Sequence, residues 1–235
     1  MTVLAIDAAT DILSVALKTE AGWSEASLDL GLRHAESLMG LVDSCLESSG
    51  LKRSELGLVA CSMGPGSFTG LRIGMAASKG IAAGLGIPWI PVPTLDALAW
   101  GYDFAPGAVA PIIDGKKGRL YSAIYRRGQR VSGWLDIPLA RLVQLLDTYP
   151  EALVTGPDAE LFREISGERS GFRIDERARC PAGRAVALLG LEAFLRSGPG
   201  PTDEGPLYLR PSEAEEPSFF RTAAPGQVGR GGGER

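Results

Sequence analysis

Apolar and polar positions along the first fifty residues predict three strands followed by one helix. The apolar run at 3–6 predicts a strand, and alternate apolar positions at 12–17 predict a second strand after a turn at 7–11. A third strand is predicted near 23–28. Apolar side chains then recur at helical spacing, and Gly50 is placed to end that helix. The residues at helical spacing are Leu38, Leu41, Val42, Cys45 and Leu46.

Strands and helices alternate through the rest of the first half. Buried strands are predicted at 56–61 and 87–92, and the helix between them, 70–84, is dense in Gly, Ala and Ser. Glycine in a helix interior costs about 1 kcal/mol relative to alanine, so we expect close packing to offset the loss. That packing is either within the lobe or against another helix or subunit. A short helix is expected from Thr94 to Trp100.

The second half of the chain repeats this order of elements. Its predicted strands are 108–113, 120–125, 131–137, 152–155 and 172–174, and its predicted helices are 139–146, 159–166 and 182–196. Three antiparallel strands followed by parallel strands with helical crossovers make a ribonuclease H-like unit. The expected fold is therefore α/β, with two tandem ribonuclease H-like lobes in the architecture of the actin-like ATPases.

A cluster of glycine and proline residues between Trp100 and Ala108 interrupts the pattern. We therefore expect an N-terminal ribonuclease H-like lobe at 1–103 and a C-terminal lobe at 104–216. The stretches Ala-Ala-Pro-Gly-Gln and Gly231–Gly233 within 217–235 cannot bury apolar surface, and we expect 217–235 to form a disordered tail.

The composition removes several classes of site and of partner. The chain has 235 residues, a formal net charge of −4 and a single histidine, His34. Zinc sites built from paired histidines are excluded, and a Ser-His-Asp triad would need His34, which we expect to be exposed near a helix start. An acidic chain lacks the charge to grip nucleic acid unaided. Three unclustered cysteines, no membrane span and no secretory signal make the cytoplasm the expected compartment.

Two polar turns in the first half are candidate ligand sites. Short side chains at 7–11 leave N–H groups open at the hairpin tip, where Asp7 could orient a metal-bound phosphate; a polar turn without a ligand explains them too. The run 64–74, Gly-Pro-Gly-Ser-Phe-Thr-Gly-Leu-Arg-Ile-Gly, lies between a buried strand and a helix, a generic arrangement for anion binding. The vestigial phosphate-type site predicted from both turns comprises Asp7, Gly64, Gly66 and Ser67.

The 64–74 run matches no standard nucleotide motif. Walker A ends in Gly-Lys-Ser/Thr, where this chain has Gly-Leu-Arg, and the spacing of Gly64, Gly66 and Gly70 is one residue too long for the Rossmann motif. Glycines that permit a tight turn and close packing are the alternative explanation. A further polar turn, 114–118, is either the second-half counterpart of the 7–11 turn that begins at Asp7 or a solvated hairpin turn.

Four segments of the chain resemble the bacterial TsaB family, whose members pair with TsaD. They are 4–10, Leu-Ala-Ile-Asp-Ala-Ala-Thr; the 64–74 run; 93–96, Pro-Thr-Leu-Asp; and 207–211, Leu-Tyr-Leu-Arg-Pro. The 64–74 run is highly characteristic of that family, and the other segments support it. The resemblance implies a role in making threonylcarbamoyladenosine next to the anticodon of tRNAs that read codons beginning with A.

The resemblance also implies a noncatalytic scaffold or activator. TsaD carries a two-histidine metal motif, whereas here Leu38 stands where the second histidine would follow His34, so no metal site is implied. The implied partners are a TsaD-like protein and a TsaE-like ATPase, with tRNA contacted only through their complex. No cofactor is expected to be required, and weak nucleotide binding stays open. We expect a homodimer when the partner is absent, because an apolar helix face should not stay exposed.

The dimerisation face of the family, formed by its first two helices, maps onto eight residues of this chain. These are Leu38, Leu41, Val42, Cys45, Gly74, Ala77, Ser78 and Ile81. The alternative function is an actin-like-fold ATP-dependent kinase or ATPase that holds a magnesium nucleotide with Asp7, the 64–67 turn and Asp114. The single histidine disfavours a metalloprotease.

Overall fold

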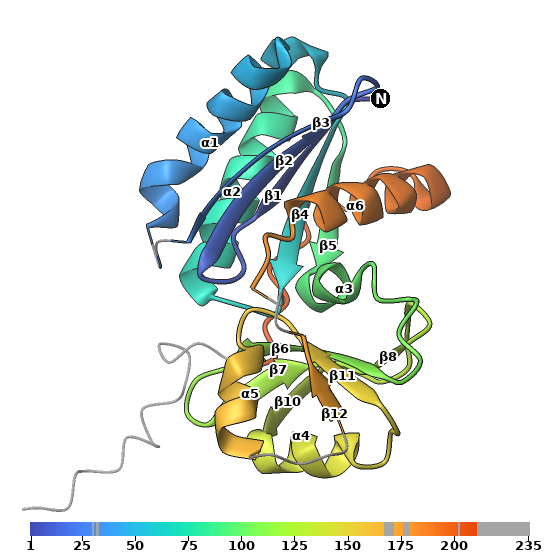
Figure 1. Ribbon diagram of the computed structural model, residues 1–235. Helices are drawn as coiled ribbons and strands as arrows, with labels where there is room; N and C mark the ends of the chain where they lie inside the picture. Colours follow the sequence, from blue (N-terminus) through green and yellow to red (C-terminus); the bar gives the residue numbers. More distant parts are fainter. Residues whose placement is uncertain (30, 32, 167–171, 176–178, 202, 211–235) are drawn as a thin grey trace, which may run out of the picture.

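Two α/β lobes lie one above the other in the computed structural model (Figure 1). It describes residues 1–29, 31, 33–166, 172–175, 179–201 and 203–210. The first lobe has a five-stranded sheet in the order β3-β2-β1-β4-β5. Its strands are β1 (Val3–Asp7), β2 (Ile12–Lys18), β3 (Trp23–Asp29), β4 (Leu58–Gly64) and β5 (Trp89–Pro93). The first three are antiparallel, and β4 and β5 continue the sheet in parallel with β1.

Strand β1 forms the centre of the first lobe, because all five of its residues are buried. Its side chains point alternately to the two faces of the sheet. Leu4 and Ile6 pack in the cluster that α1 and α2 cover, whereas Val3 and Ala5 belong to the cluster on the opposite face. The helices on this side are α1 (His34–Ser49) and α2 (Phe68–Leu85), and the 3-10 turn η1 (Arg53–Glu55) follows α1. Helix α1 ends at Gly50 in the left-handed conformation, as predicted.

Helix α6 (Gly183–Ser197) covers the other face of the first sheet, although it follows the second lobe in sequence (Figure 1). The backbone approaches closely at Gly190, where a Cβ atom would lie 2.5 Å from Ala60 Cβ in β4. The Gly183 N–H donates to Ser14 Oγ at 2.9 Å and fixes the first turn. The division predicted from the sequence placed this helix in the C-terminal lobe, 104–216. In the structure the helix packs on the first lobe. The residue bounds of the two lobes stay a prediction.

The second lobe repeats the strand order of the first. Its sheet runs β10-β7-β6-β11-β12, with β7 antiparallel to β6 and β10, and β11 and β12 parallel to β6. The elements are β6 (Val109–Asp114), β7 (Arg119–Ser122), β8 (Tyr125–Arg126), β9 (Gln129–Arg130), β10 (Leu135–Pro138), β11 (Ala152–Thr155), β12 (Phe172–Ile174), α4 (Leu139–Leu146) and α5 (Ala159–Ser166). The same order in both sheets confirms the predicted α/β fold with two tandem ribonuclease H-like lobes.

The second lobe departs from the prediction at residues 120–137. Two long strands were expected there, but a small hairpin, β8–β9, separates β7 from β10. Its two turn residues, Arg127 and Gly128, have φ angles of 51° and 73°. Left-handed backbone at both positions is the geometry of a tight two-residue hairpin turn. The sequence did not predict this turn, because such turns usually have Asn, Asp or Gly, not Arg, at the first position.

The short helix α3 (Thr94–Ala99) lies between the lobes (Figure 1). Its side chains Leu95 and Leu98 belong to one apolar cluster that also contains Val3 of the first sheet and Val109 of the second. The lobes therefore share part of a core. Within the described residues, none of the helices has the length and apolar character needed to cross a membrane.

We predict that Gly190→Val weakens the packing of α6 on β4. The added side chain would enter the space that Ala60 occupies, and overpacking of this kind costs about 1–3 kcal/mol. The matched control is Gly84→Ala in α2, where a Cβ atom meets nothing within 4 Å and helix propensity favours alanine by about 1 kcal/mol. Urea denaturation measures both free energies of unfolding; wild-type stability of the Gly190 variant would contradict the close approach.

Candidate functional site

The first hairpin turn and the 64–74 run touch each other directly. The Ser67 N–H donates to the Ala9 carbonyl at 2.7 Å. A Cβ atom at Gly66 would lie 2.2 Å from the Ala9 oxygen, and one at Gly70 would lie 2.1 Å from the Ala8 oxygen. Real Cβ atoms do not approach a carbonyl oxygen so closely, so both positions need glycine for packing alone.

Further groups of the 64–74 run also have protein partners. Ser67 is the N-cap of α2, and its Oγ accepts from the Gly70 N–H at 3.2 Å. The Gly64 N–H donates to Thr94 Oγ1 at 3.0 Å. An anion site needs several N–H groups aimed at one open point. The geometry therefore favours the packing explanation of this run, while nucleotide binding by Gly64, Gly66 and Ser67 stays a prediction.

Asp7 lies beneath the hairpin turn and is only 2% exposed. Its Oδ1 accepts from the Ala9 N–H at 3.1 Å, and the neighbouring Ala8 N–H donates to Ser62 Oγ at 3.3 Å. Burial raises the pKa of the Asp7 carboxyl, against hydrogen bonds from Ser62 and Ala9 and the nearby His34, which lower it. The side chain thus shapes the turn from within, and its part in phosphate binding stays a prediction.

His34 is buried at 2% exposure, so the prediction of an exposed residue is wrong. Its Nε2 lies 2.7 Å from the Thr10 carbonyl oxygen. Because a carbonyl oxygen only accepts, Nε2 carries the proton in this contact. The imidazole also lies against Gly70, whose Cβ would be 3.3 Å from His34 Cδ2. The histidine therefore joins the start of α1 to both turns.

The turn between β6 and β7 in the second lobe carries acidic side chains. Asp114 and Lys116 form an ion pair at 2.8 Å, and the Asp114 N–H donates to Asp158 Oδ2 at 2.7 Å. Burial raises the pKa of Asp158, and the carboxylates of Asp114 and Asp11 raise it further. Asp11 belongs to the first-lobe turn, so carboxylates of both lobes interact here. Asp158 carries no sequence motif, and sequence reasoning missed it.

These carboxylates do not form a metal centre. Among the side chains that the structure describes, no three His, Cys, Asp or Glu residues gather in a way that would hold a metal ion. A phosphate between the two turns would meet the carboxylates of Asp11, Asp114 and Asp158. The nearby cations are already paired, Lys116 to Asp114 and Arg179 to Asp29. Like charges at this range disfavour an anion.

A hollow of about 640 Å³ lies elsewhere, between α3, the β8–β9 hairpin and α6. Asp96, Trp100, Tyr125 and Arg130 are among its lining residues. The Tyr125 hydroxyl donates to Asp96 Oδ1 at 2.6 Å, and burial raises the pKa of the Asp96 carboxyl. None of the sequence-predicted site residues lines this hollow.

Five of the eight residues mapped to the family's dimerisation face are buried inside the lobe. These are Leu38, Val42, Cys45, Gly74 and Ser78. Both helices turn these positions toward the sheet: Ser78 Oγ, for example, accepts from Trp89 Nε1 at 2.9 Å. Only Leu41, Ala77 and Ile81 are partly exposed. Four exposed small residues of α2 lie one to three positions from Ala77 and Ile81, at Ala76, Gly80, Ala83 and Gly84.

A family model and two relatives of known name match this chain over much of its length. The model of the family "TsaD: tRNA N6-adenosine threonylcarbamoyltransferase" matches residues 30–154. The tRNA threonylcarbamoyladenosine biosynthesis protein TsaB of Escherichia coli is 39% identical over 224 residues, covering 89% of this chain and 95% of that protein. The protein of the same name from Bacillus subtilis is 30% identical, covering 92% and 96%.

Solved structures agree with this assignment. YeaZ from Pseudomonas aeruginosa matches with a TM-score of 0.75 and 25% identity, over 88% of this chain and 99% of that one. The ethanolamine utilization protein EutJ from Carboxydothermus hydrogenoformans has a TM-score of 0.51 at 15% identity, over 80% and 89% of the two chains, and shares the fold alone. From the extent of these matches, the chain belongs to the TsaB family of tRNA threonylcarbamoyladenosine biosynthesis proteins.

Proposed function

We propose that this chain is a noncatalytic subunit in the formation of threonylcarbamoyladenosine in tRNA, where it binds and activates a TsaD-like transferase. Two relatives that match over nearly their whole length are named for this biosynthesis. The main support for a noncatalytic role is the contact between the 64–67 turn and the first hairpin turn. There the Ala9 carbonyl occupies the space that a side chain at position 66 would need.

The charges between the lobes support the same conclusion. The carboxylates of Asp11, Asp114 and Asp158 lower the affinity of this space for phosphate, and Asp7 is buried behind the hairpin turn. A kinase or ATPase needs the opposite arrangement, with cations and open N–H groups around the phosphates. The alternative function, which relied on Asp7 and Asp114, is therefore the weaker one.

The outward face of α2 supports a role in protein binding. Ala76, Gly80, Ala83 and Gly84 are exposed there, and a Cβ atom at either glycine meets nothing within 4 Å. Small residues let a neighbouring helix backbone approach closely. We place the TsaD-like partner on this face, flanked by the partly exposed Leu41, Ala77 and Ile81, and a second copy of the chain on it when that partner is absent.

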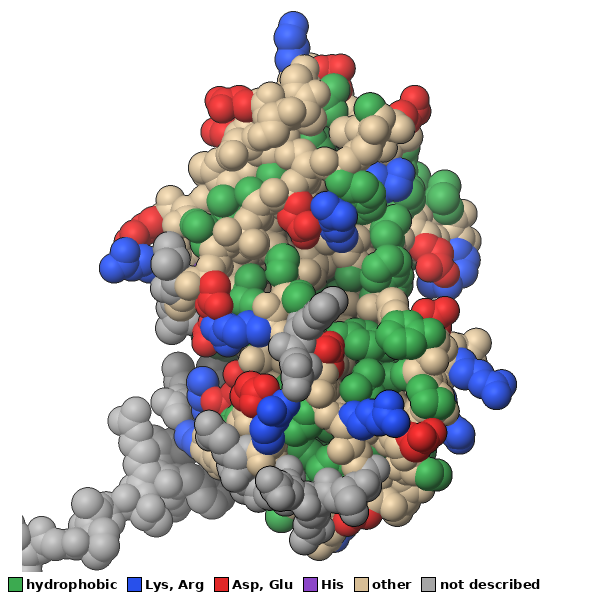
Figure 2. All heavy atoms as spheres, viewed as in Figure 1, with side chains coloured by type: hydrophobic (Ala, Val, Ile, Leu, Met, Phe, Trp, Pro, Cys, Tyr) green, Lys and Arg blue, Asp and Glu red, His purple; other side chains and the backbone are tan. Residues whose placement is uncertain are grey.

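Contact with RNA is assigned to the assembled complex. On the face shown in Figure 2, acidic and basic side chains are interspersed and no single basic patch stands out. A protein that grips phosphates alone concentrates Lys and Arg on one surface. The proposal therefore includes tRNA contact, and a TsaE-like ATPase, only through the complex with the TsaD-like protein.

We predict that reconstituted tRNA modification needs this chain although the chain alone produces none. Modified adenosine, measured by mass spectrometry, should fall at least about tenfold when the chain is omitted, which corresponds to about 1.4 kcal/mol of lost activation. Calorimetry with millimolar ATP and magnesium should show no binding to the isolated chain. A full rate without the chain would contradict the activator role, and tight ATP binding would favour the ATPase.

We predict that Gly80→Arg blocks assembly while the lobe stays folded. The position is exposed and open, and arginine is a better helix former than glycine, so the substitution should not destabilise the lobe. The arginine side chain would instead clash with a protein that packs against α2. Affinity for the TsaD-like partner should drop at least about tenfold, and light scattering should show a monomer. Gly80→Ala, which adds one methyl group, is the control that keeps both contacts. Unchanged assembly of the arginine variant would place the partner elsewhere.

We predict that Asp7→Asn stabilises the protein at neutral pH. A raised pKa means that the folded state penalises the ionised carboxylate, so Asp7 lowers stability as pH rises above the ordinary carboxyl range and costs nothing below it. Asparagine keeps an acceptor for the Ala9 N–H without the charge. The melting temperature of the variant should exceed that of wild type at pH 7, and the difference should shrink toward pH 4. A variant less stable than wild type at pH 7 would contradict a net penalty for the ionised Asp7 carboxylate.

A further inference from the structure

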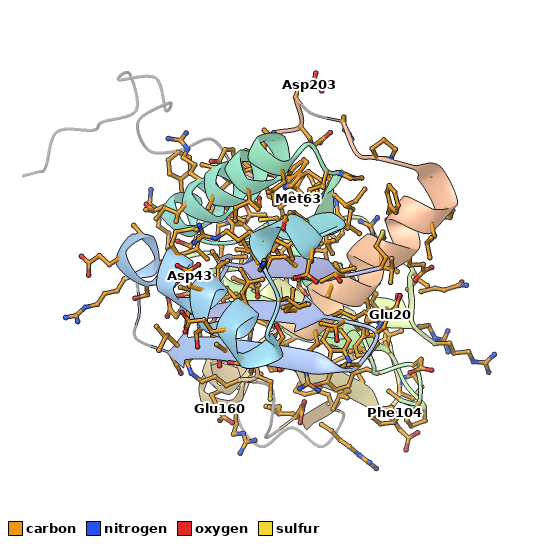
Figure 3. The ribbon with its side chains drawn as sticks, turned by 90° about the horizontal axis from the view of Figure 1, so that it is seen from above. Glu20, Asp43, Met63, Phe104, Glu160 and Asp203 are labelled. Carbon is orange, nitrogen blue, oxygen red and sulfur yellow. The ribbon has the colours of Figure 1, made fainter. Side chains whose placement is uncertain are left out.

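The last described residues cross from the first lobe to the second. The segment 203–210, here called the strap, follows Gly200, whose N–H donates to the Trp89 carbonyl in β5 at 3.2 Å. The Leu207 N–H then donates to the Met63 carbonyl at 2.7 Å. Figure 3 shows Met63 near the middle of the molecule, whereas Asp203 lies at its periphery. The strap therefore runs inward from the surface to the end of β4.

Tyr208 fixes the strap to the start of α2. Its ring stacks on the Phe68 ring with centroids 4.9 Å apart, and its hydroxyl accepts from Arg72 Nε at 3.0 Å. The Arg72 guanidinium lies 3.8 Å from the centroid of the Phe68 ring. Phe68 and Arg72 belong to the 64–74 run, so the part of that run that does not contact the first hairpin contacts the strap.

Gly64 allows the strap to pass. A Cβ atom there would lie 2.6 Å from the Leu207 carbonyl oxygen, and the glycine has a φ angle of 110°. Lys79, one residue before Gly80 on α2, donates through Nζ to the Glu204 carbonyl. The first lobe thus holds the strap with backbone, aromatic and cationic contacts at three successive places.

Arg210 fixes the other end of the strap to the second lobe. Its guanidinium donates to the Gly115 carbonyl and to the Tyr121 hydroxyl, the latter at 3.3 Å. Its Nε lies 2.9 Å from Asp136 Oδ2, an ion pair outside hydrogen-bond geometry. The Asp136 carboxylate is 13% exposed and also binds Arg119 at 2.8 Å. Because the group is mostly buried, solvent screens this pair less than a surface ion pair.

We propose that residues 203–210 form an interlobe clamp in which Tyr208 anchors on α2 and Arg210 on the second sheet, so that the two lobes keep one relative orientation without a bound ligand. The shared cluster around α3 joins the lobes by apolar packing, and Tyr125 of the second lobe donates to Asp96 of α3 beside it. The clamp adds directional contacts from one continuous segment to both lobes. This device is independent of the proposed partner and of the tRNA reaction.

The proposed clamp can be tested by measuring the spread of distances between the two lobes. Spin labels are placed at Glu47→Cys on α1 and Gln144→Cys on α4, both exposed positions, in a Cys180→Ser background that removes the exposed native thiol. Pulsed electron resonance on the full chain should give one narrow distance distribution. Tyr208→Ala and Arg210→Ala should each broaden it. Arg72→Ala should broaden it less than Tyr208→Ala, because the stack of Tyr208 on Phe68 remains, and it should add nothing to Tyr208→Ala in the double variant.

Two controls separate the clamp from local damage. Arg141→Ala, an exposed arginine on α4, should leave the distribution narrow. Tyr208→Phe keeps the ring stack on Phe68 and loses only the hydroxyl that accepts from Arg72, so it should give a width between those of wild type and Tyr208→Ala. A wild-type distribution in Arg210→Ala, with both lobes folded by circular dichroism, would overturn the proposal.

Discussion

The first lobe depends on a backbone contact between two turns. The carbonyl groups of Ala8 and Ala9 occupy the volume that Cβ atoms at positions 70 and 66 would fill, so glycine at both positions lets α2 begin directly against the first hairpin. The Ser67 N–H satisfies the Ala9 carbonyl, and His34 satisfies the neighbouring Thr10 carbonyl from α1. These contacts set where both helices start on the sheet and hence which of their faces point outward.

The same contact decides what the turns can do chemically. The N–H groups of Ala9, Gly64 and Ser67 already bind protein acceptors, and the Asp7 carboxyl is buried beneath the first turn. Across the gap, Asp158 and Asp114 add negative charge beside Asp11. The fold thus keeps two facing turns, while their groups serve to pack and orient the lobe, which suits a subunit that acts by presenting a surface to a partner.

The order of elements could be predicted because burial leaves a periodic trace in the sequence. Apolar runs located the central strands, helical spacing located α1, and Gly50 located its end. Contacts between residues far apart in the sequence leave no such periodic pattern. The buried His34 bonds to a carbonyl twenty-four residues away, and α6 packs on the first sheet with Gly190 directly against Ala60. The glycines at 66 and 70 were ambiguous in principle, since the absence of a side chain admits a phosphate or a backbone equally well.

The strap shows why two distant segments of sequence carry the family resemblance together. Residues 64–74 and 207–211 are separated by more than a hundred positions, yet Tyr208 stacks on Phe68 and binds Arg72. The 64–74 run therefore has two partners, the first hairpin through its glycines and the strap through its aromatic and basic side chains. A helix held in this way from both sides presents its outward face in a fixed position relative to the second lobe, and rigid presentation lowers the ordering cost of any partner that docks there.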